Sequence, residues 1–94
     1  MLEITFGAND EIILAGRFDA MEAEKARRVF LTLDDAKTVD FSRLDYISSA
    51  GLGVLLAAQK RLSEQGKGLR LVNVNGHIRD VFHFSGFDQV FQIE

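Results

Sequence analysis

The stretch that decides the fold is residues 39–62, VDFSRLDYISSAGLGVLLAAQKRL. An apolar-rich strand runs into Leu44–Ile47, two serines follow, and the remainder repeats leucines at helical spacing. Serine is a preferred residue at the start of a helix, where its oxygen accepts a hydrogen bond from a free backbone N–H group. We therefore predict that Ser48 and Ser49 cap a helix that ends near Gly66.

The chain before this stretch predicts a hairpin and a helix. Residues 2–6 alternate apolar and polar side chains, and residues 11–18 form a second apolar strand after a short turn. Asp19 is a candidate helix N-cap, with Glu22 three residues later as its capping-box partner. The helix that follows has an apolar face and a charged face, as expected of a helix that lies on a sheet.

The remaining elements alternate between strand and helix, with strands predicted at 38–41, 69–74 and 90–93 and a helix at 78–84. This alternation implies parallel pairing through right-handed crossovers. We expect one α/β domain over residues 1–94, with a mixed sheet of four to five strands that opens with a hairpin and is covered by three to four helices.

Composition excludes several classes of function. The net charge is -3 with no basic stripe, which argues against nucleic-acid binding, and the lack of cysteine removes disulfides and thiol catalysis. Two histidines and scattered carboxylates show no metal-ligand spacing, and no phosphate-loop motif is present, so we expect no metal and no cofactor. The longest apolar run, 54–58, is far shorter than the roughly 20 residues that span a bilayer, and no targeting segment is visible. We expect a soluble cytoplasmic protein that is not an enzyme.

The serines at the predicted strand–helix junction are the candidate functional residues. Free N–H groups and the helix dipole favour an anion at a helix start, so a phosphoryl group on Ser49 would be held there. Gly51 and Gly53 would let the backbone of another protein approach closely. The alternative is that Ser49 only caps the helix, a role worth about 1 kcal/mol.

Three motifs resemble the STAS family, which occurs in anti-sigma factor antagonists and in the cytoplasmic tails of sulphate transporters. Residues 46–53, YISSAGLG, resemble the family's Asp-Ser-Ser-Gly-Leu-Gly run at a strand–helix junction. Residues 16–19, GRFD, are similar to its Gly-Glu-Leu-Asp, and residues 81–87, VFHFSGF, to its late helix that ends in Ser-Gly-Phe. The matches keep the family's order and cover nearly the whole chain.

The resemblance departs from the family at the phosphorylated serine. That serine directly precedes the glycine in the best-known antagonists, and the position is Ala50 here, while the family's preceding aspartate falls on Ser48. Ser49 is the favoured phosphoacceptor and Ser48 the second choice. The other interpretation is a relative that cannot be phosphorylated.

The resemblance implies a bacterial partner-switching protein that binds an anti-sigma factor which is also a serine kinase, with a PP2C-like phosphatase to reset it. The implied partner-binding residues are Asp19, Ala50, Gly51, Leu52, Gly53 and Leu56. The alternative is a structural STAS subunit of a lipid-transport ATPase complex, and an enzyme with Ser49 as nucleophile is disfavoured because no base is evident. Oligomeric state stays open: residues 2–6 are a candidate edge strand for pairing that Glu3 could blunt.

Overall fold

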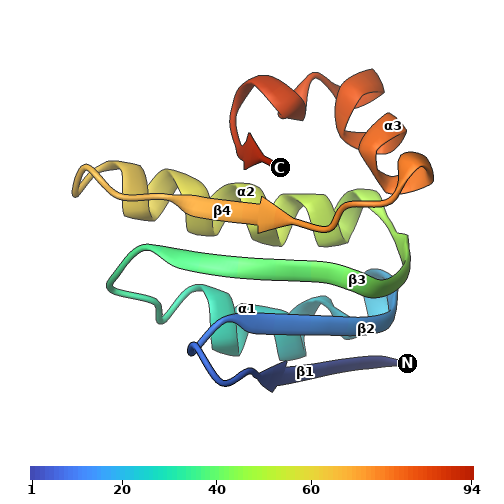
Figure 1. The fold of residues 1–94 in the computed structure, drawn as a ribbon, viewed down its shortest axis with the longest axis horizontal. Helices are drawn as coiled ribbons and strands as arrows, with labels where there is room; N and C mark the ends of the chain where they lie inside the picture. Colours follow the sequence, from blue (N-terminus) through green and yellow to red (C-terminus); the bar gives the residue numbers. More distant parts are fainter.

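A mixed five-stranded sheet organises the protein, as the computed structural model of residues 1–94 shows (Figure 1). The strands lie in the sheet in the same order as in the chain, and only the first pair, β1 and β2, is antiparallel. The sheet is formed by β1 (Leu2–Phe6), β2 (Ile12–Phe18), β3 (Lys37–Ile47), β4 (Leu69–Val72) and β5 (Gln92–Ile93). This arrangement confirms the predicted fold class, including the opening hairpin.

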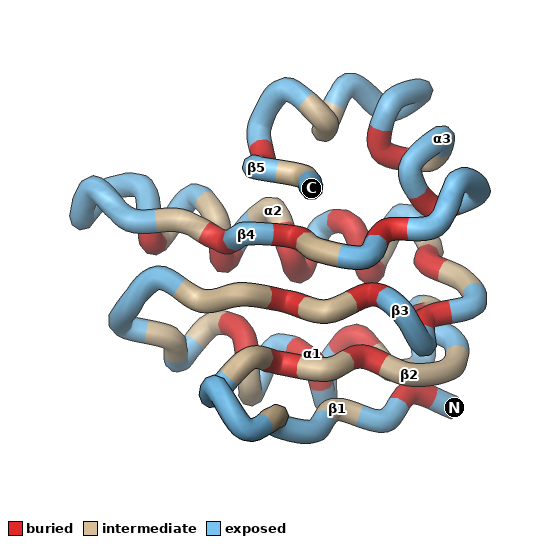
Figure 2. Tube along the Cα trace, viewed as in Figure 1, coloured by how far each residue is buried: buried red, intermediate tan, exposed pale blue.

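Helices cover one face of this sheet. In Figure 1, α1 (Ala23–Phe30) and α2 (Ser49–Ser63) lie behind the strands, and α3 (Gly76–Ser85) lies above β4. The buried residues follow the strands and the inner sides of these helices (Figure 2). The Phe82 ring of α3 meets the rings of Phe41 and Phe91 edge-on, with centroids 6.1 and 5.5 Å away, which fastens the C-terminal segment to the sheet.

Strand β3 is longer and less regular than the sequence predicts. The predicted strand at 38–41 and the apolar stretch at 44–47 are one continuous strand, Lys37–Ile47. Its residues 39–47 lie opposite residues 12–18 of β2, so nine residues face seven, and the register shifts twice. Each shift is a β-bulge that adds an unpaired residue and interrupts the period-two alternation. A pattern of strict alternation therefore finds only pieces of β3.

Asp40 supports the first bulge. Its Oδ1 accepts hydrogen bonds from the backbone N–H of Ser42, at 2.8 Å, and from Nδ2 of Asn73, at 3.2 Å. Burial opposes the ionised form, but these hydrogen bonds outweigh it and hold the pKa of the Asp40 carboxyl below its ordinary value.

This lowered pKa predicts an acid-dependent stability. Because the folded pKa lies below the unfolded value of about 3.9, the stabilisation is complete above that value and is lost as the pH falls through the folded pKa. We expect the free energy of unfolding of Asp40→Asn to fall less than that of the wild type between pH of about 6 and about 2.5. Urea unfolding at a series of pH values measures this difference, and parallel curves for the two proteins would contradict it.

The predicted start of the first helix and the predicted end of β4 are both wrong, each for a local reason. Asp19 caps a short 3-10 turn, Ala20–Glu22, by accepting from the N–H of Met21 at 3.2 Å. Glu22 does not complete a capping box, because its Oε1 accepts from the N–H of Leu2 instead. Strand β4 ends at Val72 rather than at residue 74, because the next residue, Asn73, has a left-handed φ of 58° that cannot continue a strand.

Two other boundaries differ only in length. Helix α3 begins at Gly76, two residues before the predicted start, because the Asn75 side chain caps it by accepting from the N–H of Ile78 at 2.9 Å. The last strand is reduced to Gln92–Ile93, which still pairs in parallel with β4 as the predicted position requires.

Candidate functional site

Ser48 ties the end of β2 to the start of α2. Its backbone N–H and its hydroxyl both donate to the carbonyl oxygen of Phe18, at 2.9 and 3.2 Å. The same hydroxyl oxygen accepts from the N–H of Gly51 at 3.2 Å, which makes Ser48 the N-cap of α2. The hydroxyl therefore already serves as donor and acceptor, and its residue is half-buried.

Ser49 is the first residue of α2 and has a different environment. Its side chain is exposed, and its hydroxyl makes no hydrogen bond within the protein. The interpretation of Ser49 as the helix cap is therefore wrong, since Ser48 has that role. The N–H groups of Ser49 and Ala50 have no acceptor within the helix, as is general for the first turn. An exposed hydroxyl thus lies beside free backbone donors and the positive end of the helix dipole.

Asp19 lies at the same end of the sheet. It directly follows Phe18, whose carbonyl holds Ser48, and it is half-buried. The short turn that Asp19 caps packs against α2. Met21 in that turn is 92% exposed, which is unusual for a large apolar side chain. Met21 is not among the candidate residues predicted from the sequence. Its one signal in the sequence is that it is an apolar residue on the charged face of the predicted helix.

The structure divides the predicted partner-binding residues into two groups. Gly53 is exposed, and Ala50 and Leu56 are half-buried; Ser49, Gly53 and Leu56 follow one another on the same helix face at spacings of four and three. Leu52, by contrast, is only 5% exposed and belongs to the core, so its expected exposure is wrong. We call the accessible residues the α2-start surface: Asp19, Met21, Ser49, Ala50, Gly53 and Leu56.

Gly51 also differs from the expectation. It is buried, and a Cβ at this position would lie 2.9 Å from the Phe18 carbonyl oxygen and 2.9 Å from Cγ1 of Ile47. The absence of a side chain therefore lets α2 approach the sheet within this chain, and does not leave room for another protein. Gly53 has nothing within 4 Å of a built Cβ and keeps the role of an open position.

A matched pair of substitutions separates the two serines. Ser48→Ala removes the cap and leaves the N–H of Gly51 without its acceptor, so we expect a loss of about 1 kcal/mol in the free energy of unfolding. Ser49→Ala removes a hydroxyl that makes no internal hydrogen bond, so we expect a change within about 0.5 kcal/mol. Chemical denaturation of both variants measures this. Equal losses would contradict the assignment of the cap to Ser48.

Of the α2-start surface, only Leu56 lines a hollow, which extends along α2 and also includes Gln59, Lys60 and Ser63. The largest hollow, of about 750 Å³, lies at the opposite ends of the strands and includes Lys37, Lys67 and Arg70. Each of these cations already forms an ion pair with a carboxylate. No group of three or more histidine, cysteine, aspartate or glutamate side chains is placed to hold a metal ion. No helix has the length and apolar character needed to cross a membrane.

These features define a class of protein, namely a small α/β domain that presents an exposed serine on the surface where a strand leads into a helix. The family model described as "Mlab, STAS domain" matches residues 5–93. The chain is 37% identical over 82 residues to BtrV of Bordetella bronchiseptica, a protein assigned as an anti-sigma factor antagonist, covering 87% of this chain and 70% of BtrV. The chain belongs to the STAS domain family and is of the anti-sigma factor antagonist type.

Solved structures agree with this fold. An anti-sigma factor antagonist from Mycobacterium paratuberculosis superposes with a TM-score of 0.80 at 19% identity, covering 99% of this chain and 83% of that one. The phosphorylated form of the Bacillus cell fate determinant SpoIIAA gives a TM-score of 0.71 at 21% identity, covering 100% and 91%. Its unphosphorylated form gives 0.69 at 20% identity, covering 96% and 97%.

Proposed function

We propose that the protein is a partner-switching anti-sigma factor antagonist whose binding is controlled by phosphorylation of Ser49. The observation that carries this proposal is the contrast between the two serines. The Ser49 hydroxyl is exposed and unbonded, whereas the Ser48 hydroxyl is engaged by Phe18 and Gly51. A kinase can reach the first without breaking any contact.

The position of Ser49 also suits a phosphate. A phosphoryl group adds about -1.5 to -2 charges and three acceptor oxygens at pH 7. At the first position of α2 it lies next to N–H groups that have no acceptor within the helix, so the modified chain stays folded. Phosphorylation of Ser48 would instead remove the N-cap of α2 and its bond to β2. Ser49 is the acceptor that leaves the fold unchanged.

The effect on a partner follows from the surroundings. Unmodified, the α2-start surface combines small and apolar residues, Ala50, Gly53, Leu56 and Met21, with the single carboxylate of Asp19. Such a surface suits close packing against another protein. A phosphate in its centre must lose water when a partner docks, and it adds to the negative charge of Asp19. Binding of the unmodified form and release of the modified form are thus the expected behaviour.

The partners supply the chemistry in this proposal. The first partner is an anti-sigma factor that also acts as an ATP-dependent serine kinase, and a PP2C-like phosphatase removes the phosphate. The relative BtrV, which is assigned as an anti-sigma factor antagonist, supports the first of these partners. The chain itself acts by binding and not as an enzyme, and this role places it in the cytoplasm.

The test is to purify the tagged protein from its native host and analyse it with its companions by tryptic mass spectrometry. Cleavage after Arg43 and Lys60 gives a peptide, residues 44–60, whose possible acceptors are Tyr46, Ser48 and Ser49. We expect phosphate on Ser49 and a small serine kinase among the companions. A peptide that stays unmodified, accompanied by a transport ATPase, would overturn the proposal in favour of a structural STAS subunit.

A further inference from the structure

Strand β1 forms one free edge of the sheet, at the lower margin in Figure 1. The backbone N–H and C=O groups of its odd-numbered residues point towards β2 and form hydrogen bonds with it. The carbonyl of Met1 accepts from the N–H of Arg17, at 3.0 Å, and the N–H of Gly7 donates to the carbonyl of Glu11, at 2.9 Å. Inward and outward backbone groups alternate in an antiparallel pair, so the N–H and C=O groups of the even residues point away from the sheet.

Half of this edge is covered by the chain itself. The outward N–H of Leu2 donates to Oε1 of Glu22, and the carbonyl of Leu2 accepts from the ammonium group of Lys25. The other half, at Ile4 and Phe6, has no such cover. The residues there include no charge and no proline, the usual protections of an exposed strand edge.

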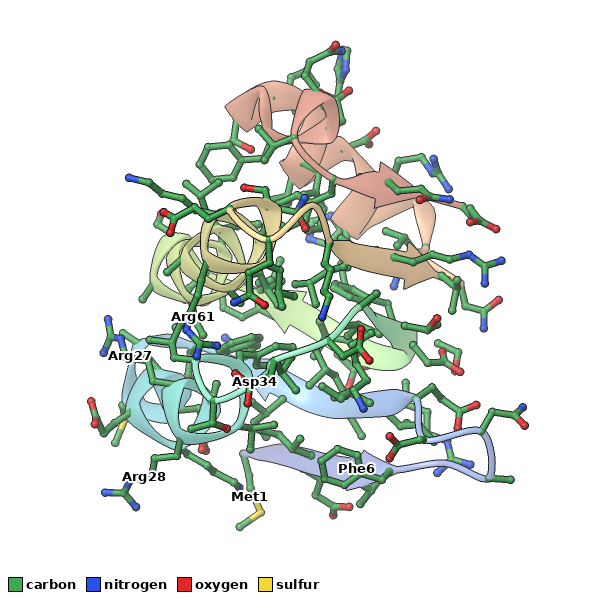
Figure 3. All side chains as sticks on the ribbon, turned by 90° about the vertical axis from the view of Figure 1, so that its left-hand side faces the viewer. Met1, Phe6, Arg27, Arg28, Asp34 and Arg61 are labelled. Atoms are coloured by element: carbon green, nitrogen blue, oxygen red, sulfur yellow. The ribbon has the colours of Figure 1, made fainter.

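Phe6 adds an apolar side chain to the open half. It is 56% exposed, although it is one of the eight phenylalanines of a chain whose other phenylalanines mostly build the core. Figure 3 shows Met1 and Phe6 along β1 at the margin of the molecule. Leu2, Ile4 and Phe6 share one face of the strand, because side chains alternate along it. The open backbone and the exposed ring therefore coincide.

We propose that two copies of this chain pair through β1 in antiparallel fashion, with the two-fold axis at Thr5. Ile4 then lies opposite Phe6 of the second copy, and Thr5 lies opposite its counterpart. Because Ile4 and Phe6 both direct their backbone groups outward, each Ile4–Phe6 pair forms two hydrogen bonds. The dimer gains four such bonds, and each exposed Phe6 ring packs on the Ile4 side chain across the interface.

Other registers use the edge less well. An axis at Ile4 places Phe6 against Leu2, whose outward groups are occupied by Glu22 and Lys25. An axis at Phe6 places Ile4 against Ala8, which belongs to the turn after β1. The axis at Thr5 alone matches all the open groups and leaves the internal bonds of Leu2 intact. It places Glu3 opposite Gly7, where the carboxylate of Glu11 occupies the space of a side chain, so one like-charge contact at each end of the paired segment opposes the pairing.

The pairing is independent of the proposed phosphorylation switch. The α2-start surface lies where β2 and β3 end, and it includes no residue of β1. A dimer through β1 carries two such surfaces, and it joins the five-stranded sheets of the two copies into one continuous sheet. If Ser49 proved not to be phosphorylated, the proposed dimer would be unaffected. If the chain proved to be monomeric, the proposed phosphorylation switch would be unaffected.

The first test is sedimentation equilibrium of the purified chain up to high micromolar concentrations, where we expect a reversible dimer. Phe6→Pro removes an outward N–H that makes no bond within the chain, and the extended residue before it tolerates a proline. We expect dimerisation to weaken at least about tenfold, since two intermolecular hydrogen bonds are lost. A wild-type chain that stays monomeric over this range overturns the proposal.

The second test does not depend on tolerance of proline. Thr5 is exposed, and its counterpart in the second copy lies directly across the axis. Thr5→Lys and Thr5→Glu should each weaken self-association by a few-fold through like-charge contact, and an equimolar mixture should restore it as a heterodimer. Ala57→Lys and Ala57→Glu, on an exposed position of α2, are the matched controls and should leave self-association unchanged. The proposal is also overturned if the mixture of the two Thr5 variants associates no more strongly than either variant alone.

Discussion

Replacing Ser49 with aspartate should weaken binding of the anti-sigma factor by at least about tenfold, which corresponds to about 1.4 kcal/mol. The substitution puts a fixed negative charge on the α2-start surface, which already includes the half-buried carboxylate of Asp19. A partner that packs there must strip water from the new carboxylate. The fold should not suffer, because an acidic residue in the first turn of a helix is favourable by about 0.3–1 kcal/mol.

The two effects are measured separately. Isothermal titration with the kinase recovered by co-purification gives the affinity, and thermal unfolding gives the stability, which should stay the same or rise slightly. Gln65→Glu is the matched control: it adds the same charge at an exposed position just past the far end of α2, about 24 Å along the helix axis, and should bind normally. A Ser49→Asp protein that binds with unchanged affinity would remove Ser49 from the interface.

Two glycines of the same helix should respond to alanine in opposite directions. Gly51→Ala should reduce the free energy of unfolding by about 1–3 kcal/mol, because its Cβ would come within 2.9 Å of the Phe18 carbonyl, a backbone atom that cannot turn aside. Gly53→Ala should raise it by up to about 1 kcal/mol, because the position is open and alanine is the better helix former.

Urea denaturation of the two variants provides the measurement, with circular dichroism as the signal. Both variants replace a glycine of α2 with alanine. A difference in the sign of the stability change therefore reports on the contact between position 51 and the end of β2, and not on helix propensity. If Gly51→Ala were as stable as the wild type, the close approach of α2 to Phe18 would not hold in solution. Gly53→Ala has a second use, since a loss of partner binding without a loss of stability would locate the interface at that position.

Regular elements of the fold could be predicted from the sequence, and irregular ones could not. The first strand was predicted with the observed bounds, 2–6, because alternation and a nearby turn specify an antiparallel edge strand. β3 was found in pieces, because one bulge between residues 40 and 43 and a second between residues 44 and 46 break the alternation. A bulge is set by pairing with β2, a contact distant in sequence that local pattern cannot show.

The strand–helix junction that carries the candidate site could be predicted from the sequence, but the roles of its two serines required side-chain geometry. Two adjacent serines are equivalent as cap candidates from sequence, and only the hydrogen bond from the Gly51 N–H to the Ser48 hydroxyl assigns the cap to Ser48. Leu52 was expected on the surface because the family motif places it next to the glycine. A helix that lies on a sheet turns one side inward, and Leu52 falls on that side with Leu55.

The strand order has a consequence for how the chain acquires its structure. Each strand pairs with the one synthesised just before it, so no strand has to wait for a distant partner. Pairing in chain order keeps each loop shorter than a closure across the whole chain, which limits its entropic cost and favours folding from the N-terminal end. All the hydrogen bonds that hold Ser48 involve residues 18–52, so the surface beside it can form on the nascent chain while α3 and β5 are still unmade. The C-terminal third, fastened mainly through Phe82 and Phe91, completes the core last.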